Sequence, residues 1–294
     1  MIKIAIIGGT GLLGSNLVRL FSQYDVKAFS RRLGDNIFNE KNNIINFNNM
    51  ETKLSNYFNK WIPDIIINTV ALVNLEKCEK DYSKAYYINC EIAVNIAKIA
   101  QKYNSYFIHI STDHYFNDKK DLHNEIDKVI LLNNYAKTKY EAEKEIVKIN
   151  DKSLIVRTNI IGYRRTKIKS FFEWLLESLK SEDKIELYTN FYTSPINVNH
   201  LGDILLKCYN KKLFGIYNIS SKEAINKYNF GLKVANKFEY NFQNVKKVKL
   251  LNEGNRLKRA LSLGLDVSKI ENNLNISMPT IDEVIDSLHK EQYE

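Results

Sequence analysis

The sequence predicts an α/β protein: a Rossmann-type, doubly wound parallel sheet followed by a smaller mixed α/β C-terminal domain. Short apolar runs alternate with longer amphipathic stretches in the first half of the chain, and a glycine-rich segment directly follows the first apolar run. After about residue 162 this alternation gives way to short, mixed segments. Such alternation is typical of parallel strands covered on both faces by helices. Ligands are therefore expected at the carboxyl ends of the strands.

The elements follow from the apolar patterns. Six runs predict strands: Lys3 to Gly8, Val26 to Ser30, Asn43 to Phe47, Asp64 to Val70, Ser105 to Thr112 and Ser153 to Ile161. Amphipathic stretches predict helices at about Leu12 to Phe21, Tyr82 to Tyr103 and Asn134 to Ile149. The second part predicts helices at Ser170 to Leu179 and Thr280 to Leu288. Strands alternating with helices in this way form βαβ units.

Composition excludes several classes of protein. The chain has 294 residues, of which 44% are hydrophobic, but lacks an unbroken apolar run of the ~18 residues that a membrane span needs. Met1 runs directly into the first strand, so we expect a cytoplasmic protein without a membrane partner. Its three cysteines and five histidines form no CxxC or HxxxH pair, which predicts neither disulfides nor a metal site. The net charge of +9 is scattered, which favours a solvated surface over nucleic-acid binding, with phosphate-bearing ligands as the alternative.

The glycine-rich segment predicts a dinucleotide site. Four of the eleven glycines fall within residues 8–14, between the first strand and the first helix. Glycines there allow a tight turn, close approach of backbone N–H groups to a pyrophosphate, and close packing of the helix. The residues predicted to contact the cofactor in this loop are Gly8, Thr10, Gly11, Leu12, Leu13 and Gly14.

The end of the second strand predicts which dinucleotide is bound. NAD-selective sites usually have an acidic residue there, which bonds the ribose 2′-hydroxyl. This strand instead ends in Ser30, Arg31 and Arg32, which suit a 2′-phosphate. We therefore predict NADPH, with NADH as the alternative if both arginines point into solvent. The dinucleotide domain is placed at residues 1–165, rejoined by about residues 193–214, and a smaller substrate-binding domain at residues 166–294.

A tyrosine and a lysine one helical turn apart predict carbonyl reduction. Tyrosine can protonate a developing alkoxide if a nearby ammonium lowers its pKa. The spacing Tyr-x-x-x-Lys places both side chains on one face of a helix. In this tyrosine-rich chain it occurs at Tyr115/Lys119, Tyr135/Lys139, Tyr140/Lys144 and Tyr163/Lys167. Only Tyr135 begins the helix after the fifth strand, so Tyr135 and Lys139 are the predicted catalytic pair.

The fifth strand supplies further candidates. It ends with Thr112, whose hydroxyl could polarise the same carbonyl oxygen. A threonine in a strand is usually only a good strand former, and the Tyr135/Lys139 pair is what favours a catalytic role. His114 follows in the predicted loop, and we expect it to contact substrate rather than to transfer protons.

The chain resembles the extended short-chain dehydrogenase/reductases, and within them the dTDP-4-dehydrorhamnose reductase family. The matching motifs are Gly-Gly-Thr-Gly-Leu-Leu-Gly at 8–14, Ser-Thr-Asp at 111–113 and Tyr-Ala-Lys-Thr-Lys at 135–139. Further matches lie at Asn68 to Glu79, Asn89, Arg157-Thr158, Gly215 to Ser220 and Arg259 to Lys269. The resemblance implies Thr112, Tyr135 and Lys139 as the catalytic set, with Lys139 also holding the nicotinamide ribose. It implies a nucleotide-activated 4-keto-sugar as substrate, used in polysaccharide precursor synthesis.

The resemblance also places Ala71 at the cofactor, and it implies substrate contacts at Val73, Asn74, Asn159 and Arg259. The related 4,6-dehydratases carry an acidic residue where this chain has His114, which favours a simple reductase. Departures from the family pattern at His114-Tyr115-Phe116 and Ile160 leave the particular sugar open. A 4-epimerase is one alternative. A non-catalytic NADP-binding protein, like the regulatory beta subunit of methionine adenosyltransferase, is another. Members of the family are often dimers, so the resemblance makes a homodimer one expectation for this protein, although no residue pattern in the sequence decides it.

Overall fold

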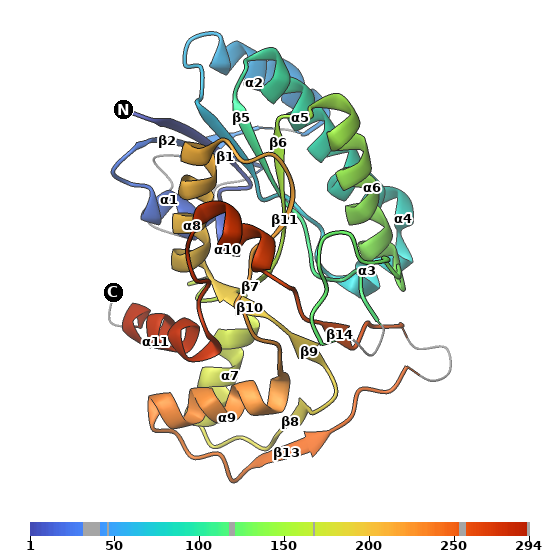
Figure 1. Cartoon of the computed structure of the whole chain (residues 1–294), viewed down its shortest axis with the longest axis vertical. Coiled ribbons are helices and arrows are strands. Elements are labelled where there is room, and N and C mark those ends of the chain that lie inside the picture. The colour runs from blue at the N-terminus through green and yellow to red at the C-terminus, as the bar shows by residue number, and fades with distance from the viewer. Residues whose placement is uncertain (32–41, 46, 118–120, 167, 253–256, 293–294) are drawn as a thin grey trace. The chain divides into compact units, whose positions relative to one another are not determined.

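The computed structural model describes residues 1–31, 42–45, 47–117, 121–166, 168–252 and 257–292 (Figure 1). By compactness the chain divides into two units. Unit 1 comprises Met1–Ser111, Asn133–Val156 and Leu205–Ile216, and unit 2 comprises Thr112–Leu132, Arg157–Ile204 and Tyr217–Glu294. The chain thus crosses between the units several times, whereas the predicted functional division has one boundary at residue 165 and a return at about residues 193–214. That functional division stays a prediction.

The predicted doubly wound sheet is confirmed. Among the described residues the central sheet has seven strands in the order β11-β6-β5-β4-β1-β2-β3. In chain order they are β1 (Lys3–Ile7), β2 (Asp25–Ser30), β3 (Asn42–Ile44), β4 (Ile65–Asn68), β5 (Tyr106–Ile110), β6 (Ser153–Arg157) and β11 (Gly215–Asn218). The pairs from β3 to β6 are all parallel. The strand order reverses between β1 and β4, and a doubly wound fold binds its dinucleotide at such a switch point.

The helices of unit 1 follow the predicted pattern, with two additions. They are α1 (Leu12–Leu20), α2 (Met50–Phe58), α3 (Leu75–Lys80), α4 (Tyr82–Tyr86), α5 (Ile92–Lys102) and α6 (Asn134–Ile149). A short 3₁₀ turn, η2 (Phe47–Asn49), precedes α2, and the π-helical turn η3 (Tyr87–Glu91) joins α4 to α5. The sequence predicted neither α2 nor α3. In α2 the spacing of Met50, Leu54 and Phe58 buries one face of a short helix.

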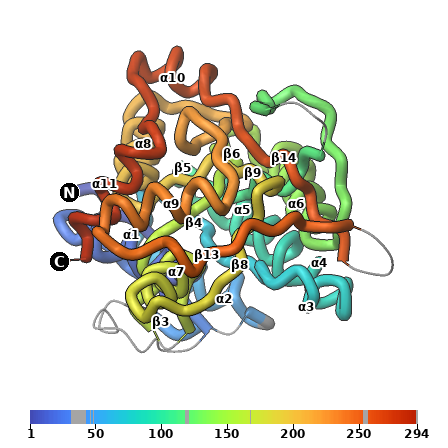
Figure 2. The backbone as a smooth tube through the Cα atoms, turned by 90° about the horizontal axis from the view of Figure 1, so that it is seen from below, coloured from blue at the N-terminus to red at the C-terminus, as the bar shows by residue number. Residues whose placement is uncertain are grey.

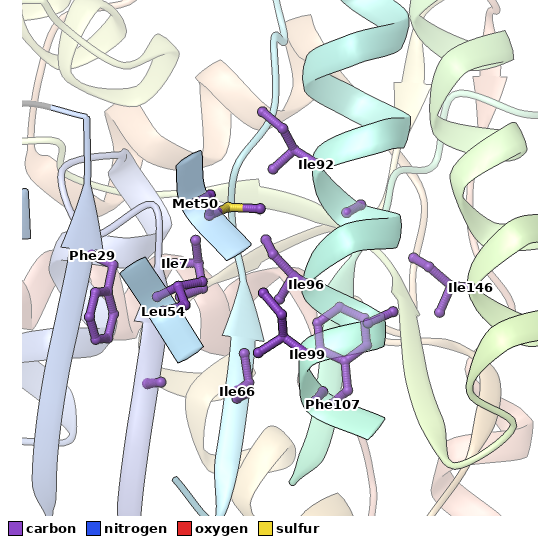
Figure 3. Packing of buried hydrophobic residues seen from close by; sticks show 14 of the residues in the cluster. Ile7, Phe29, Met50, Leu54, Ile66, Ile92, Ile96, Ile99, Phe107 and Ile146 are labelled. Atoms are coloured by element: carbon purple, nitrogen blue, oxygen red, sulfur yellow. The ribbon is translucent and has the colours of Figure 1, made fainter. Parts of the chain in front are cut away.

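The core of unit 1 lies between the sheet and the helices α2, α5 and α6. Figure 3 shows Ile96 and Ile99 of α5 beside Ile66 of β4 and Phe107 of β5, with Leu54 of α2 nearby. All five side chains are buried, and each fully buried aliphatic or aromatic side chain stabilises the fold by roughly 1.5–3 kcal/mol. This packing holds the strands whose carboxyl ends carry the site.

The other face of the sheet is also covered. Ile4 and Ile6 alternate with Ala5 and Ile7 along β1, and all four side chains are fully buried. Helix α1 packs against β1 and β2. Burial on both faces explains why the strands appear in the sequence as continuous apolar runs instead of alternating ones.

Unit 2 is a mixed α/β structure. Its strands are β7 (Asn159–Ile161), β8 (Ile185–Tyr188), β9 (Tyr192–Thr193), β10 (Pro195–Asn197), β12 (Ile225–Asn226), β13 (Val245–Val248) and β14 (Ser262–Leu263). Its helices are α7 (Phe171–Lys180), α9 (Lys227–Phe238), α10 (Ser268–Leu274) and α11 (Ile281–Glu291), while α8 (Val198–Lys211) spans both units. Strands β8 and β13 run parallel, side by side (Figure 2), and β9 pairs with β12 in the antiparallel sense.

One predicted strand is wrong in its extent. The run from Ser153 to Ile161 forms two strands, β6 and β7, which separate at Thr158 and enter different sheets. β6 pairs with β5, whereas β7 pairs with β10. The apolar pattern continues through the break because both strands are buried, so periodicity alone cannot locate it.

Candidate active site

The glycine-rich loop is closely packed at two positions. A Cβ atom on Gly14 would lie 2.3 Å from the carbonyl oxygen of Gly8, and one on Gly8 would lie 2.5 Å from Thr69 Oγ1. Gly8 also has φ +101°, a conformation that side-chain-bearing residues rarely adopt. Gly11 differs, because its Cβ atom would meet Gly8 O at 3.4 Å, an ordinary contact. Gly8 and Gly14 are therefore required for the close approach of β1, α1 and the segment after β4.

The N-terminus of α1 fits an anionic group. Gly11 is its N-cap residue, and within the described residues no side chain caps it and the first turn carries no acid. The positive end of the helix dipole and its first N–H groups therefore face a loop of small residues, as a pyrophosphate site requires. Thr10, Leu12 and Leu13 lie in the same turn, where the sequence predicted them to contact the cofactor.

The remaining predicted cofactor residues lie at the ends of β2 and β4. Ser30 is buried, whereas Arg31 is exposed and its guanidinium lies 5.3 Å from the centre of the Phe47 ring. Arg32 lies outside the described residues. Ala71 is half-buried in the loop after β4. Ser30 thus ends β2, and Arg31 and Ala71 follow β2 and β4 at the carboxyl edge of the sheet.

The loop that holds Ala71 is fixed to η3 and α6 by Asn89. The buried Asn89 side chain accepts a hydrogen bond from Leu72 N at 2.7 Å and donates to Thr138 Oγ1 at 3.0 Å. Thr138 directly precedes Lys139 in α6. One buried amide therefore links the loop at the switch point to the helix of the predicted catalytic pair.

Tyr135 lies in the first turn of α6. The N-cap residue Asn133 accepts a hydrogen bond from Ala136 N at 2.9 Å, which begins the helix at this point. The Tyr135 ring packs against Cys78 and Ala85 and is 8% exposed. Packing of the ring on one side restricts the direction in which its hydroxyl can point.

Lys139 is buried one turn after Tyr135. Its Nζ donates a hydrogen bond to Ile110 O at 2.8 Å and lies 3.1 Å from His109 Nε2. Burial lowers the pKa of Lys139 to about 8, while the nearby Glu143 and Cys90 act in the opposite direction. Glu143 is itself buried and accepts a hydrogen bond from Ser111 Oγ at 2.6 Å. A lysine with a lowered pKa in a buried polar setting is typical of a functional site.

The other Tyr-x-x-x-Lys pairs have different surroundings. Lys144 is exposed, stacks over the Tyr140 ring at 5.4 Å and pairs with Glu141 at 2.8 Å. Tyr163 donates its hydroxyl to Leu288 O at 3.1 Å. Lys119 and Lys167 lie outside the described residues.

A polar cluster in unit 2 contains three of the predicted residues. Asn159 donates a hydrogen bond to Asp113 Oδ2 at 2.7 Å, and the Thr112 hydroxyl lies 3.4 Å from Asp113 Oδ1. His114 Nε2 lies 3.9 Å from Asp113 Oδ1. Burial raises the pKa of Asp113, although His114, Asn159 and Lys227 act against this. Asp113 therefore orients Asn159 and Thr112, a role that the sequence did not assign to it.

Lys227 is the most notable residue of this cluster that the sequence did not predict. It is the first residue of α9, and its Nζ lies 4.6 Å from the centre of the Phe171 ring. Burial lowers the pKa of Lys227 to about 8, and Asp113 acts in the opposite direction. Burial also lowers the pKa of His114, as do the charges of Arg259 and Lys227. No motif marks Lys227 among the 43 lysines and arginines, so only its position in the fold brings it to notice.

Three further residues were predicted to contact the substrate, and their surroundings in the structure are ordinary. Val73 is 67% exposed in the loop before α3. Asn74 is the N-cap of α3 and accepts a hydrogen bond from Lys77 N at 2.8 Å. Arg259 is half-buried, and its backbone is held by a pair of hydrogen bonds to the Asn252 side chain. Asn74 thus has a capping function whether or not it contacts a ligand.

The described residues contain neither a metal site nor a membrane-spanning helix. No group of three or more potential ligands is arranged to hold a metal ion there, and none of the described helices is long and apolar enough to cross a membrane. The three cysteines are free and buried.

The lowered pKa of Lys139 predicts how the free energy of unfolding depends on pH. In the unfolded chain the pKa of a lysine is near 10.5. Burial of Lys139 therefore lowers the free energy of unfolding by its full amount below pH 8, and by progressively less as the pH rises from 8 to 10.5. Lys139→Met should therefore raise the free energy of unfolding relative to wild type at pH 7, and this advantage should shrink by about 2 kcal/mol by pH 9.5. Urea unfolding at both pH values measures it.

The matched control is Lys144→Met, which removes an exposed lysine from the same helix. Its stability relative to wild type should barely depend on pH. An advantage of Lys139→Met that stays constant from pH 7 to 9.5 would contradict the lowered pKa.

Fold and site together define the class of the protein. The structure combines a doubly wound sheet, a glycine loop packed too closely for side chains at Gly8 and Gly14, and a tyrosine one turn from a buried lysine. Together these features define a nicotinamide-dependent oxidoreductase of the extended short-chain dehydrogenase/reductase type. The comparison with known families agrees with this class. The chain belongs to the RmlD substrate binding domain family, whose model matches residues 2–293.

Two curated relatives and one solved structure align with nearly the whole chain. It is 23% identical to the probable low-salt glycan biosynthesis reductase Agl14 of Haloferax volcanii over 288 residues, which is 96% of each chain. It is 25% identical to dTDP-4-dehydrorhamnose reductase of Aggregatibacter actinomycetemcomitans over 291 residues, 94% of each chain. Among solved structures, dTDP-4-dehydrorhamnose reductase of Bacillus anthracis in complex with NADP superposes with a TM-score of 0.86, at 23% identity and 99% coverage of both chains.

Proposed function

We propose that the protein reduces the keto group of a nucleoside-diphosphate 4-keto-sugar, with NADPH as the hydride source. The observation that carries the proposal is the buried Lys139, held by Ile110 O one helical turn after Tyr135 in the unit that also contains the glycine loop. Such a pair supplies a proton to a carbonyl that becomes an alkoxide. When bound, the nicotinamide would supply the hydride.

The residues of this chain have separate roles in the proposed reaction. Tyr135 donates its hydroxyl proton to the oxygen of the former carbonyl. Lys139 holds the nicotinamide ribose, and its ammonium form stabilises the tyrosinate that remains. Thr112 donates a hydrogen bond to the same carbonyl oxygen, which polarises the bond before reduction. Each role uses a group that is buried in this structure.

The glycine loop and β2 support the choice of cofactor. The turn between Gly8 and Gly14 would hold the pyrophosphate against the N-terminus of α1. Ser30 and Arg31 would contact the adenosine ribose and its 2′-phosphate, together with Arg32. Solved relatives in complex with NADP and with NAD are consistent with NADPH as the main cofactor and NADH as the alternative.

The charges of unit 2 support an anionic, hydroxyl-rich substrate. Arg259 and Lys227 contribute positive charge near His114. Asn159 adds an amide of the kind that bonds sugar hydroxyls. The names of the relatives, dTDP-4-dehydrorhamnose reductase and a glycan biosynthesis reductase, favour a nucleotide sugar as the ligand of this cluster.

The decisive experiment follows NADPH absorbance while the protein is mixed with a panel of nucleotide-linked 4-keto-sugars, each generated in place by a matching dehydratase. Stoichiometric oxidation with one sugar supports the reductase and identifies its substrate. An epimerase would interconvert sugars without net loss of NADPH. If NADPH binds and no sugar is changed, the reductase proposal fails in favour of a regulatory binding protein.

The cofactor preference makes a further prediction. Replacing Arg31 and Arg32 by alanine should weaken NADPH binding roughly 10- to 100-fold, because a charge-assisted hydrogen bond contributes about 1.5–3 kcal/mol. NADH binding should change little, and titration of cofactor fluorescence measures both. Lys27→Ala, which removes a charge from the same strand, is the matched control. Equal turnover of the wild type with NADH and NADPH would refute the preference.

A further inference from the structure

Lys139 ends a chain of buried hydrogen bonds that begins at the switch point of the sheet. The Asn68 side chain accepts a hydrogen bond from Val70 N at 3.0 Å, and its Nδ2 lies 3.1 Å from His109 Nδ1. On the other side of the ring, His109 Nε2 lies 3.1 Å from Lys139 Nζ. Asn68, His109 and Lys139 are at most 1% exposed. Neighbouring strands β4 and β5 thus deliver an amide and an imidazole to the lysine of α6.

The direction of these hydrogen bonds follows from the backbone. A backbone N–H can only donate, so the Asn68 atom that faces Val70 is Oδ1 and the atom that faces His109 is Nδ2. Nδ2 can also only donate, so His109 Nδ1 accepts and carries no proton. Burial and the charge of Lys139 both lower the pKa of His109 well below its usual value, so the ring is neutral. The single ring proton therefore lies on Nε2 and points at Lys139.

An N–H that points at Nζ distinguishes between the two forms of the lysine. The neutral amine accepts from His109 Nε2–H with its lone pair and donates to Ile110 O. The ammonium has no lone pair, so it would place two donors against each other at this contact. Asn68 has no proton that it can transfer, so this chain orients the lysine and is not a route for protons.

We propose that His109 is a positioning residue for Lys139: Asn68 holds the Nε2–H of His109 toward Nζ, where only the amine form of the lysine can accept it. This inference rests on the proposed function for its purpose. Tyr135 must regain the proton that it donates, and a lysine whose pKa lies near the working pH can take up and return that proton.

The other groups that face Lys139 act in the opposite direction. Glu143 on α6 and Cys90 on η3 both favour the ammonium. On β5, besides His109, the lysine faces Ile110 O, and on β4 the only link in the described structure runs through Asn68. His109 therefore contributes a directed hydrogen bond that opposes the acidic side of the pocket.

The first test is made on the wild-type protein, and one variant serves only to assign the signal. In cofactor-free protein labelled with ¹⁵N-histidine, NMR should show His109 as the neutral Nε2–H form throughout the neutral pH range. The signal is assigned among the five histidines by its loss in His109→Gln. A neutral Nδ1–H form, or an imidazolium at neutral pH, would overturn the inference.

The second test reverses the ring. In Asn68→Asp the carboxylate would accept from Nδ1–H, so Nε2 becomes an acceptor for the ammonium. The titration midpoint of Lys139, followed through ¹³Cε-lysine, should rise by at least one pH unit, a roughly tenfold gain in proton affinity. Asn89→Asp is the matched control, because it adds a buried carboxylate that does not contact His109. An equal rise in both variants, with an unchanged His109 ring, would show a general charge effect and overturn the inference.

Failure of the proposed function gives a different pattern. If no sugar is reduced but His109 is Nε2–H and Asn68→Asp moves the Lys139 midpoint, the reductase proposal fails and the tuning of Lys139 stands. If a sugar is reduced, the pH profile of kcat should move with that midpoint in Asn68→Asp. A profile that stays in place while the midpoint moves would exclude a role for the exchange in turnover.

Discussion

Tyr135→Phe is expected to lower kcat by about 10²- to 10⁴-fold, the range in which a positioned general acid contributes. The change removes one oxygen and leaves the ring packed against Cys78 and Ala85, so the fold and NADPH affinity should be preserved. Single-turnover kinetics with the identified keto-sugar measure the first effect. Cofactor fluorescence and thermal unfolding measure the other two.

The same helix offers a matched control for this variant. Tyr140 lies on α6 beside the exposed Lys144, so Tyr140→Phe removes a hydroxyl from another face of the helix. Its turnover should stay near that of the wild type. Wild-type turnover in Tyr135→Phe would contradict the proposed role, and an equal loss in both variants would point to a structural effect on α6.

Gly14→Ala should be the most damaging single change in the cofactor loop. The new Cβ atom would lie 2.3 Å from Gly8 O, and the backbone of both segments would have to move apart. We expect a loss of roughly 3–5 kcal/mol of unfolding free energy, together with a large loss of NADPH affinity, because the helix N-terminus is displaced. Urea unfolding and cofactor titration check the two effects separately.

Gly11→Ala is the control for this prediction. Its Cβ atom would meet Gly8 O at an ordinary 3.4 Å, and the residue already has extended backbone angles. It should keep nearly all of the wild-type stability, whatever its effect on the pyrophosphate. Equal stability of Gly14→Ala and Gly11→Ala would show that the loop relaxes freely, against the close packing described above.

Much of the fold follows from local sequence. The strands of the parallel sheet before β6 and the helix from Asn134 to Ile149 agree with the structure to within a few residues. Helices α2 and α3 were not predicted because they are short, and the boundary of β6 was wrong because burial continues across Thr158. The site residues also divide into those that local sequence could predict and those that it could not. Tyr135 and Lys139 were selected by their place after the fifth strand. Both side chains are buried, and their catalytic role stays a prediction.

What the sequence by itself determined is therefore the class of fold, the glycine loop and the Tyr135/Lys139 spacing. These features depend on periodicity and on spacing within one turn or one helix. They can therefore be identified from residues that are close together in the sequence. Only the tertiary structure decided which buried polar groups meet. Asn68, His109 and Lys139 come from three elements, and Asp113, Asn159 and Lys227 come from a loop, a strand and a helix. Their partners are chosen by strand order and by the need to satisfy hydrogen bonds away from water, and neither leaves a pattern in the sequence.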